Sequence, residues 1–158
     1  MKARSGCKYA AYHEAGHAVL CHYLGRLAWV CMLVDQDPKR PPSYGGTLET
    51  RRDRCITDYG GVVAQAKYQR KGIEAALRTA RESDDIRFIN KEACEESSAC
   101  LGRTADDIKA GWLARAREMV RQHWPAGEAL AAALLARKKL NAYQVTEIIA
   151  KVTATAGR

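Results

Sequence analysis

Residues 8–24 read KYAAYHEAGHAVLCHYL, and this stretch decides both the expected fold and the expected chemistry. Alanine is frequent in it, no proline interrupts it, and Gly25 follows as a natural stop, so we expect an α-helix. His13 and His17 are four residues apart, which places both imidazoles on the same face of that helix. Two histidines in this arrangement are able to bind one zinc ion.

Glu14 adds a second function to the same helix. Its carboxylate follows the first histidine and is expected beside a zinc-bound water, whose pKa the metal lowers to about 7. The sequence His13-Glu14-Ala15-Gly16-His17, which is H-E-x-x-H, therefore predicts a zinc-dependent hydrolase of peptide bonds with Glu14 as general base. The alternative is a helix that carries two histidines by chance. The chain has only 4 histidines, and two of them fall at ligand spacing.

Composition predicts one compact domain. The 158 residues are 47% hydrophobic, and the abundance of alanine with a single phenylalanine favours closely packed helices. The chain contains no apolar run long enough for a transmembrane span, and residues 1–7 lack the apolar segment of a secretory signal, so we expect a cytoplasmic protein. No C-x-x-C pair occurs, and Cys21, Cys31 and Cys94 are expected in the core.

The formal net charge of +8 comes largely from three basic clusters, at residues 51–54, 69–71 and 137–139. A basic surface is able to attract nucleic acid or acidic partners. The clusters have no interleaved aromatic residues and no DNA-binding motif accompanies them, so solvated helix faces are the favoured interpretation. Nucleic acid is not an expected partner, although a basic nucleic-acid module with a structural zinc remains an alternative.

The apolar pattern predicts a mainly α fold with a small β-hairpin or short sheet near residues 28–50. The strands are expected at 28–34 and 47–49, with a loop between them. Later helices are expected at about 51–71, 84–94, 104–123, 128–138 and 141–152, with a loop at 95–98 and an interruption at 125–127. Residues 72–82 are expected to form a polar, alanine-rich connection, with a short helix as the alternative. Gly60 and Gly61 fall inside a helix, which predicts close approach to the small residues around Gly16.

The third zinc ligand is not part of H-E-x-x-H. No later histidine stands at the spacing of the extended motif, so the candidates are acidic residues at helix starts downstream. Asp84 and Asp85 are the best placed, after the expected N-cap Ser83. An aspartate in a first helical turn also has an ordinary explanation, because it interacts favourably with the helix dipole.

Several segments resemble the peptidase domain of the FtsH-type AAA zinc metalloproteases. Residues 11–19, AYHEAGHAV, look like its zinc helix, residues 59–64, YGGVVA, like its glycine-pair helix, and residues 83–86, SDDI, like the segment that supplies its third ligand. Residues 104–149 resemble its C-terminal helices. The resemblance implies a single zincin-like helical peptidase domain over residues 1–158, with a zinc-site region at about 1–100 and a C-terminal helical region at about 104–153.

The resemblance also implies roles for individual residues. His13, His17 and Asp85 would bind Zn²⁺, and Glu14 would be the catalytic residue. These four match the family pattern, whereas three nearby positions depart from it. Val62 stands where the family usually has an arginine, and Gln65 and Ala66 stand where it usually has two acidic residues. The departures fall on groups expected around the ligands, and these groups tune zinc affinity.

The implied substrate is an unfolded or extended polypeptide. A strand beside the cleft would bind it by edge pairing, through Gly45, Gly46 and Thr47. The chain contains no G-x-x-x-x-G-K-[ST] motif, so we expect a peptidase that is not itself an ATPase. The family associates as hexamers, which implies a homo-oligomer or a separate partner. The alternative is a catalytically weak or inactive scaffold of the same fold that acts through interaction.

Overall fold

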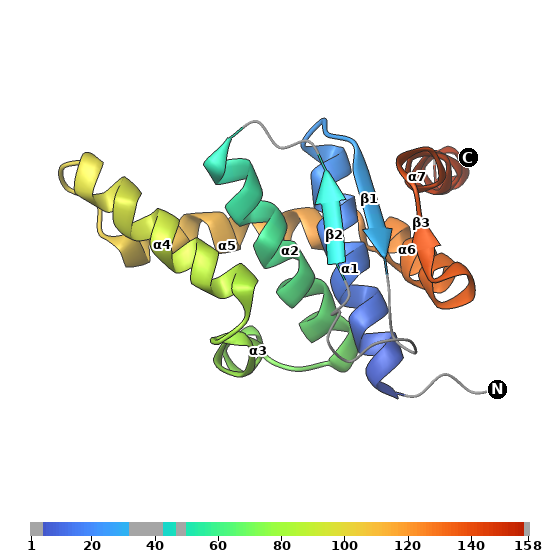
Figure 1. Ribbon diagram of the computed structural model, residues 1–158, viewed down its shortest axis with the longest axis horizontal. Helices are drawn as coiled ribbons and strands as arrows, with labels where there is room; N and C mark the ends of the chain where they lie inside the picture. Colours follow the sequence, from blue (N-terminus) through green and yellow to red (C-terminus); the bar gives the residue numbers. More distant parts are fainter. Residues whose placement is uncertain (1–4, 32–42, 47–49, 157–158) are drawn as a thin grey trace.

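The computed structural model describes residues 5–31, 43–46 and 50–156 (Figure 1). These residues are mainly helical, as predicted. In chain order the elements are α1 (Ser5–Tyr23), β1 (Ala28–Cys31), β2 (Ser43–Gly46), α2 (Arg51–Gln69), α3 (Ile73–Ala80), α4 (Asp84–Ala99), α5 (Ala105–Gln122), α6 (Trp124–Arg137), β3 (Lys139–Leu140) and α7 (Ala142–Ala156).

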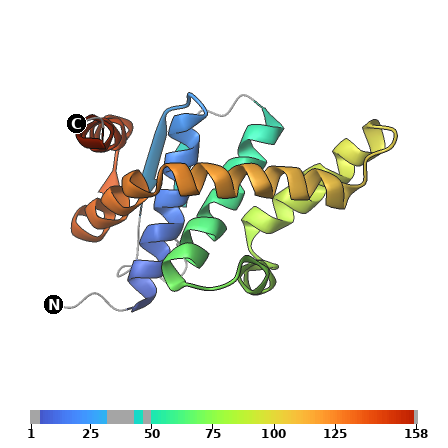
Figure 2. The same cartoon turned by 180° about the vertical axis from the view of Figure 1, so that it is seen from behind.

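Helices α1 and α2 form the centre of the molecule and pack side by side. The strands β1 and β2 lie against α1 on one side (Figure 1). Figure 2 shows the other side, where α5 crosses α2 and continues toward α6, which packs on α1. The central pair is thus covered on both faces, and this burial explains why α1 and α2 carry so many small and apolar residues.

The strands form a short antiparallel sheet in the order β2-β1-β3. In its register Ala28 pairs with Gly46, and Val30 lies between Tyr44 and Leu140. Two of the strands fall within the predicted region 28–50. Strand β2 occupies residues that the local pattern predicted as a loop, although the family resemblance implied a strand that includes Gly45 and Gly46. The predicted strand 47–49 lies outside the described residues, and β3 was not predicted. Such short strands are defined by pairing with their neighbours, which local periodicity does not reveal.

Helix α4 is longer than predicted, because the expected loop at residues 95–98 is helical. The hydroxyl groups of Ser97 and Ser98 both donate to the carbonyl of Cys94, at 2.9 Å, and so they are satisfied within the helix. The backbone N–H of Cys100 donates to the carbonyl of Glu96 and closes the last turn. The prediction of a loop was wrong because these polar side chains have partners inside the helix.

One other helix boundary differs from the prediction. The expected interruption at 125–127 is the first turn of α6, where Pro125 is tolerated because an N–H at this position has no partner in the helix. Residues 73–80 form a helix, α3, which is the short helix given as the alternative for this segment. Thr104 caps α5 together with Asp107, in the expected position.

The predicted close approach of the glycines to α1 is confirmed. A methyl group on Gly60 would come within 2.7 Å of Leu20 and 3.0 Å of the Gly16 carbonyl oxygen. A methyl group on Gly16 would in turn collide with the Gly60 carbonyl oxygen and lie 2.7 Å from Cβ of Ala64. The missing side chains therefore allow the two backbones to touch, and this contact fixes the position of α1 along the axis of α2.

The buried apolar residues form one cluster, which includes residues of both α1 and the C-terminal helices. Its fully buried members include Leu20, Ile89, Ile108, Leu130, Leu134, Leu140 and Ile149. Cys21 is buried as predicted, whereas Cys94 is exposed and the prediction that it lies in the core was wrong. No helix of the described residues is long and apolar enough to cross a membrane.

Candidate metal centre

The side chains of His13, His17 and Asp85 meet between α1 and the start of α4. Nε2 of His13 lies 3.1 Å from Oδ2 of Asp85, and Nε2 of His17 lies 3.5 Å from the same oxygen. The two imidazole rings are 4.6 Å apart and nearly perpendicular. The structure thus brings together the three predicted ligands, although 72 residues separate His13 from Asp85.

These distances suit a tetrahedral metal site. Ligand atoms at about 2.0–2.1 Å from a zinc ion in tetrahedral geometry are about 3.3 Å from one another. The measured separations of 3.1 and 3.5 Å lie on either side of that value. Two imidazoles and one carboxylate leave a fourth position open, which is the arrangement of catalytic rather than structural zinc sites.

The other nitrogen of each imidazole has an acceptor supplied by α2. Nδ1 of His13 donates to Oε1 of Gln65 at 3.1 Å, and Nδ1 of His17 donates to the carbonyl oxygen of Thr57 at 2.9 Å. These contacts use the proton on Nδ1, so Nε2 of each imidazole faces Asp85, where it can bind a metal ion or, in its place, a proton. Gln65 therefore orients a ligand even though the family resemblance implied an acidic residue at this position.

Gly61 lies directly over Nε2 of His13 and Nε2 of His17. A methyl group at this position would come within 2.9 Å of Nε2 of His13 and still closer to Nε2 of His17. The second glycine of the pair therefore leaves room for the imidazoles and a metal ion, while Gly60 sets the helix contact. The sequence analysis assigned Gly61 only to the helix contact and did not single out Thr57, yet positions 57, 61 and 65 repeat every four residues and so share one face of α2.

Glu14 is buried next to the imidazoles. Only 4% of it is exposed, and one of its carboxylate oxygens, one ring nitrogen of His13 and one of His17 lie within 4.8 Å of one another. By distance alone Glu14 could also serve as third ligand. Asp85 is the better choice, because one of its oxygens approaches both Nε2 atoms, whereas Oε2 of Glu14 has no hydrogen-bond partner among the described residues. Glu14 is thus left available as a base.

The charges of the site act strongly on one another. Burial raises the pKa of Glu14, and the neighbouring imidazoles reduce this effect only in part. Burial alone would lower the pKa of His17, but the hydrogen bond and charge of Asp85 raise it to about 9. Hydrogen bonds to His13 and His17 hold the pKa of Asp85 well below its usual value, against the effect of its burial. A metal ion and a proton would therefore compete for the same nitrogens.

The site is accessible from one side. The side chains of His13 and Asp85 are 21% and 23% exposed, whereas that of His17 is 2% exposed. Strand β2, which contains Gly45 and Gly46, packs against α1 and pairs only with β1 within the described sheet. Thr47, the third residue predicted to bind substrate, lies outside the described residues.

Comparison with known proteins gives no match: no protein-family model matches the chain, and no curated protein is significantly similar to it. The chemistry of the site is therefore inferred from its own residues. Two imidazoles and a carboxylate form a donor set that suits Zn²⁺ and related divalent ions. The additional buried carboxylate of Glu14 gives this set a base, which a purely structural metal site does not need.

Proposed function

We propose that the chain is a zinc-dependent metalloendopeptidase of the FtsH-like, zincin-like type. The observation that carries the proposal is that Nε2 of His13 and Nε2 of His17 both lie within 3.5 Å of one Asp85 oxygen, beside the buried carboxylate of Glu14. The three side chains would hold the ion, and Gln65 would orient one imidazole through its second nitrogen. Bound zinc supplies Lewis acidity, which polarises a peptide carbonyl and acidifies water.

Glu14 moves the proton in this proposal. Its carboxylate accepts a proton from the attacking water and then delivers it to the nitrogen of the leaving amine. Burial favours both steps, because it raises the pKa of the carboxyl group and brings it closer to that of the groups with which it exchanges protons. His13, His17 and Asp85 hold their positions during the reaction and exchange no proton with the substrate.

The substrate we propose is an extended segment of polypeptide. Strand β2 is an edge of the described sheet next to α1, so a peptide could pair with the backbone of Gly45 and Gly46. Backbone pairing makes few contacts with side chains, so we expect weak preference for the sequence of the substrate. It also requires that the bound segment is unfolded or exposed. We propose in addition that a separate partner unfolds folded substrates. The chain itself would assemble with further copies, as a hexamer by the family resemblance, or with that partner.

Cleavage of casein by the zinc-loaded protein tests the proposal. Replacing Glu14 with glutamine should lower the rate by about 10²–10⁴-fold, because a positioned general base contributes that much, while the zinc content stays unchanged. Glu92→Gln is the matched control, since Glu92 is also buried but pairs with Arg51 away from the metal centre. Equal cleavage by the parent and Glu14→Gln would contradict the role of Glu14. Zinc binding without any cleavage would favour a scaffold.

A further inference from the structure

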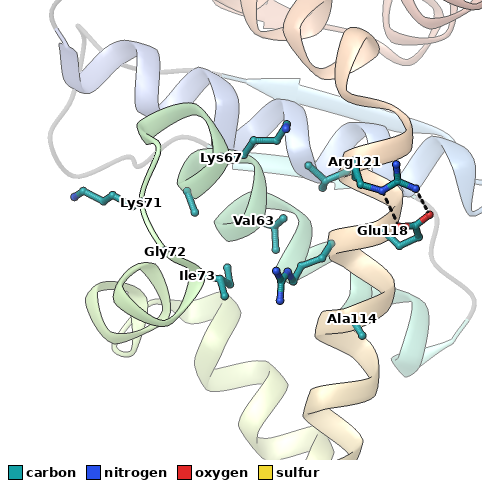
Figure 3. Close-up of a pocket in the computed structure, with 11 residues that line it drawn as sticks. Val63, Lys67, Lys71, Gly72, Ile73, Ala114, Glu118 and Arg121 are labelled. Carbon is teal, nitrogen blue, oxygen red and sulfur yellow. Dashed lines mark hydrogen bonds and ion pairs between the residues drawn. The ribbon is translucent and has the colours of Figure 1, made fainter.

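A cavity of about 580 Å³ lies between α2, the start of α3 and α5 (Figure 3). Its volume falls within the range of about 300–1,000 Å³ that is typical of ligand pockets. Val63, Ala66 and Lys67 line it from α2. These positions point away from the face of α2 that carries Thr57, Gly61 and Gln65, so the cavity is separate from the metal centre.

The rim of this cavity is strongly basic. Lys67 and Lys71 contribute from one side, and Arg121 contributes from α5 on the other (Figure 3). Arg117 of α5 also lines the cavity. Glu118 is the one acidic residue among the described residues that line the cavity. Its carboxylate already accepts two hydrogen bonds from Arg121, at 2.7 and 2.9 Å, so it leaves the other three cations without a counter-charge in the lining.

Two of the four cations are held in place by the protein. Arg121 is fixed by its two-pronged contact with Glu118, and the ammonium group of Lys67 lies 4.9 Å from the centre of the Trp124 ring. Side chains that are already ordered lose less entropy when they bind an anion. Because Glu118 already balances the charge of Arg121, Lys67 is the ordered cation of the rim that is left to meet an anion.

The floor of the cavity is apolar. Val63, Ala66 and Val120 are buried there, Ile73 is half-buried, and Ala114 is open to solvent at the edge. No side-chain hydroxyl, amide or aromatic ring is among the described lining residues, so the cavity offers nothing to read or stack a nucleobase. A free inorganic anion would leave the apolar floor uncovered. The occupant should combine several negative charges with an aliphatic body.

We propose that this cavity binds an acidic peptide segment, in which glutamate or aspartate residues flank an aliphatic side chain. The aliphatic side chain would cover Val63, Ile73 and Val120, and the carboxylates would meet Lys67, Lys71 and Arg117. Such a segment would belong to a partner or substrate protein and would bind without contact to the metal centre. This inference does not rest on the proposed peptidase activity.

Fluorescence anisotropy with a labelled peptide in which glutamates flank two leucines tests the proposal. The Glu14→Gln protein would be used, so that cleavage does not interfere. We expect saturable binding that weakens at least tenfold in the double variant Lys71→Ser with Arg117→Ser, because charge-assisted contacts to carboxylates are lost. Arg137→Ser with Lys139→Ser is the matched control: it removes the same charge from exposed positions outside the cavity and should leave binding unchanged.

A second variant tests the shape of the cavity without changing its charge. Ala114→Trp would fill the cavity from an exposed position of α5 and should abolish binding, whereas Ala132→Trp at an exposed position of α6 should not. Equal weakening by both double-serine variants would mean a general effect of charge and would overturn the proposal. So would unchanged binding by Ala114→Trp, or a single-stranded oligonucleotide that competes for the same residues with the same affinity. Competition by inorganic phosphate as strong as that by unlabelled peptide would also contradict it.

Discussion

Opposite faces of α2 serve two regions of the molecule that differ in their tolerance of change. On one face Thr57, Gly61 and Gln65 surround the imidazoles at distances that a single methyl group would disturb. On the other face Val63 and Lys67 border an open, basic cavity with an exposed rim. Binding at the metal centre therefore depends on shape and on fixed hydrogen-bond partners, whereas binding in the cavity depends on charge and volume.

The largest effect should follow from a methyl group placed on the first of these faces. Gly61→Ala would overlap the ligating nitrogens of both histidines, so we expect at least about 100-fold weaker zinc binding and a matching loss of any metal-dependent activity. Zinc titration with a competing chelator measures this. Gly111→Ala is the matched control, because Gly111 is also helical but has no atom within 4 Å of the added methyl group. A Gly61→Ala protein with parental zinc affinity would contradict the geometry of the site.

Gly16 tests the contact between α1 and α2 through the stability of the protein. The pattern H-E-x-x-H leaves this position free, but the structure places it against the backbone of Gly60. Gly16→Ala should lower the free energy of unfolding by about 1–3 kcal/mol, because the helices must move apart. Urea unfolding of this variant would be compared with that of Gly127→Ala, a buried helical glycine with open space around it. Equal unfolding free energies would show that the two helices do not touch as described.

Gln65 provides a smaller and more selective test. Gln65→Leu removes the acceptor for Nδ1 of His13 and should weaken zinc binding about tenfold, whereas Gln65→Glu keeps an acceptor and should bind zinc at least as tightly as the parent. Isothermal titration with zinc distinguishes the two variants. If both bind zinc with the parental affinity, the contact between Gln65 and His13 does not support the site.

The smallest effect concerns His123, which stacks on Tyr23 with the ring centres 3.4 Å apart. Burial lowers the pKa of His123, helped by the charge of Arg115, so the folded protein resists its protonation. The neutral His123 ring contributes to the unfolding free energy in full above the pKa of an unfolded histidine, about 6.5. This contribution is lost as the pH falls through the lower pKa that His123 has in the folded protein. Between pH 7.5 and 5 the unfolding free energy of the parent should fall further than that of His123→Gln. The extra fall should be below about 0.5 kcal/mol, since the ring is only half-buried. Urea unfolding at both pH values measures the difference, and a parent that loses less than the variant would reverse the sign.

The sequence allowed the prediction of features that arise from local patterns. The helix with His13 and His17, the cap at Ser83 and the close approach at Gly60 each follow from spacing or residue size, and the structure contains all three. The meeting of Asp85 with the histidines was implied by resemblance rather than by local chemistry, because an aspartate in a first helical turn has an ordinary explanation.

Other features depend on tertiary contacts and so could not be predicted locally. Strand β2 lies at Ser43–Gly46 because β1 pairs with it, although the residues suggest a loop. The end of α4 is helical because Ser97 and Ser98 find acceptors within it. The basic cavity joins residues of α2 and α5 that are about fifty positions apart in the chain, so no single basic cluster of the sequence indicated it.

The proposed metal centre depends most on Asp85, and zinc content tests its role as a ligand directly. Elemental analysis should give one zinc per chain in the parent and in Asp84→Ala, because Asp84 is exposed at the start of α4. Asp85→Ala should lose most of its zinc while it keeps the helical circular dichroism spectrum of the parent. A parent that binds no zinc when metal is supplied, or an Asp85→Ala variant that keeps a full equivalent, would contradict the proposed metal centre.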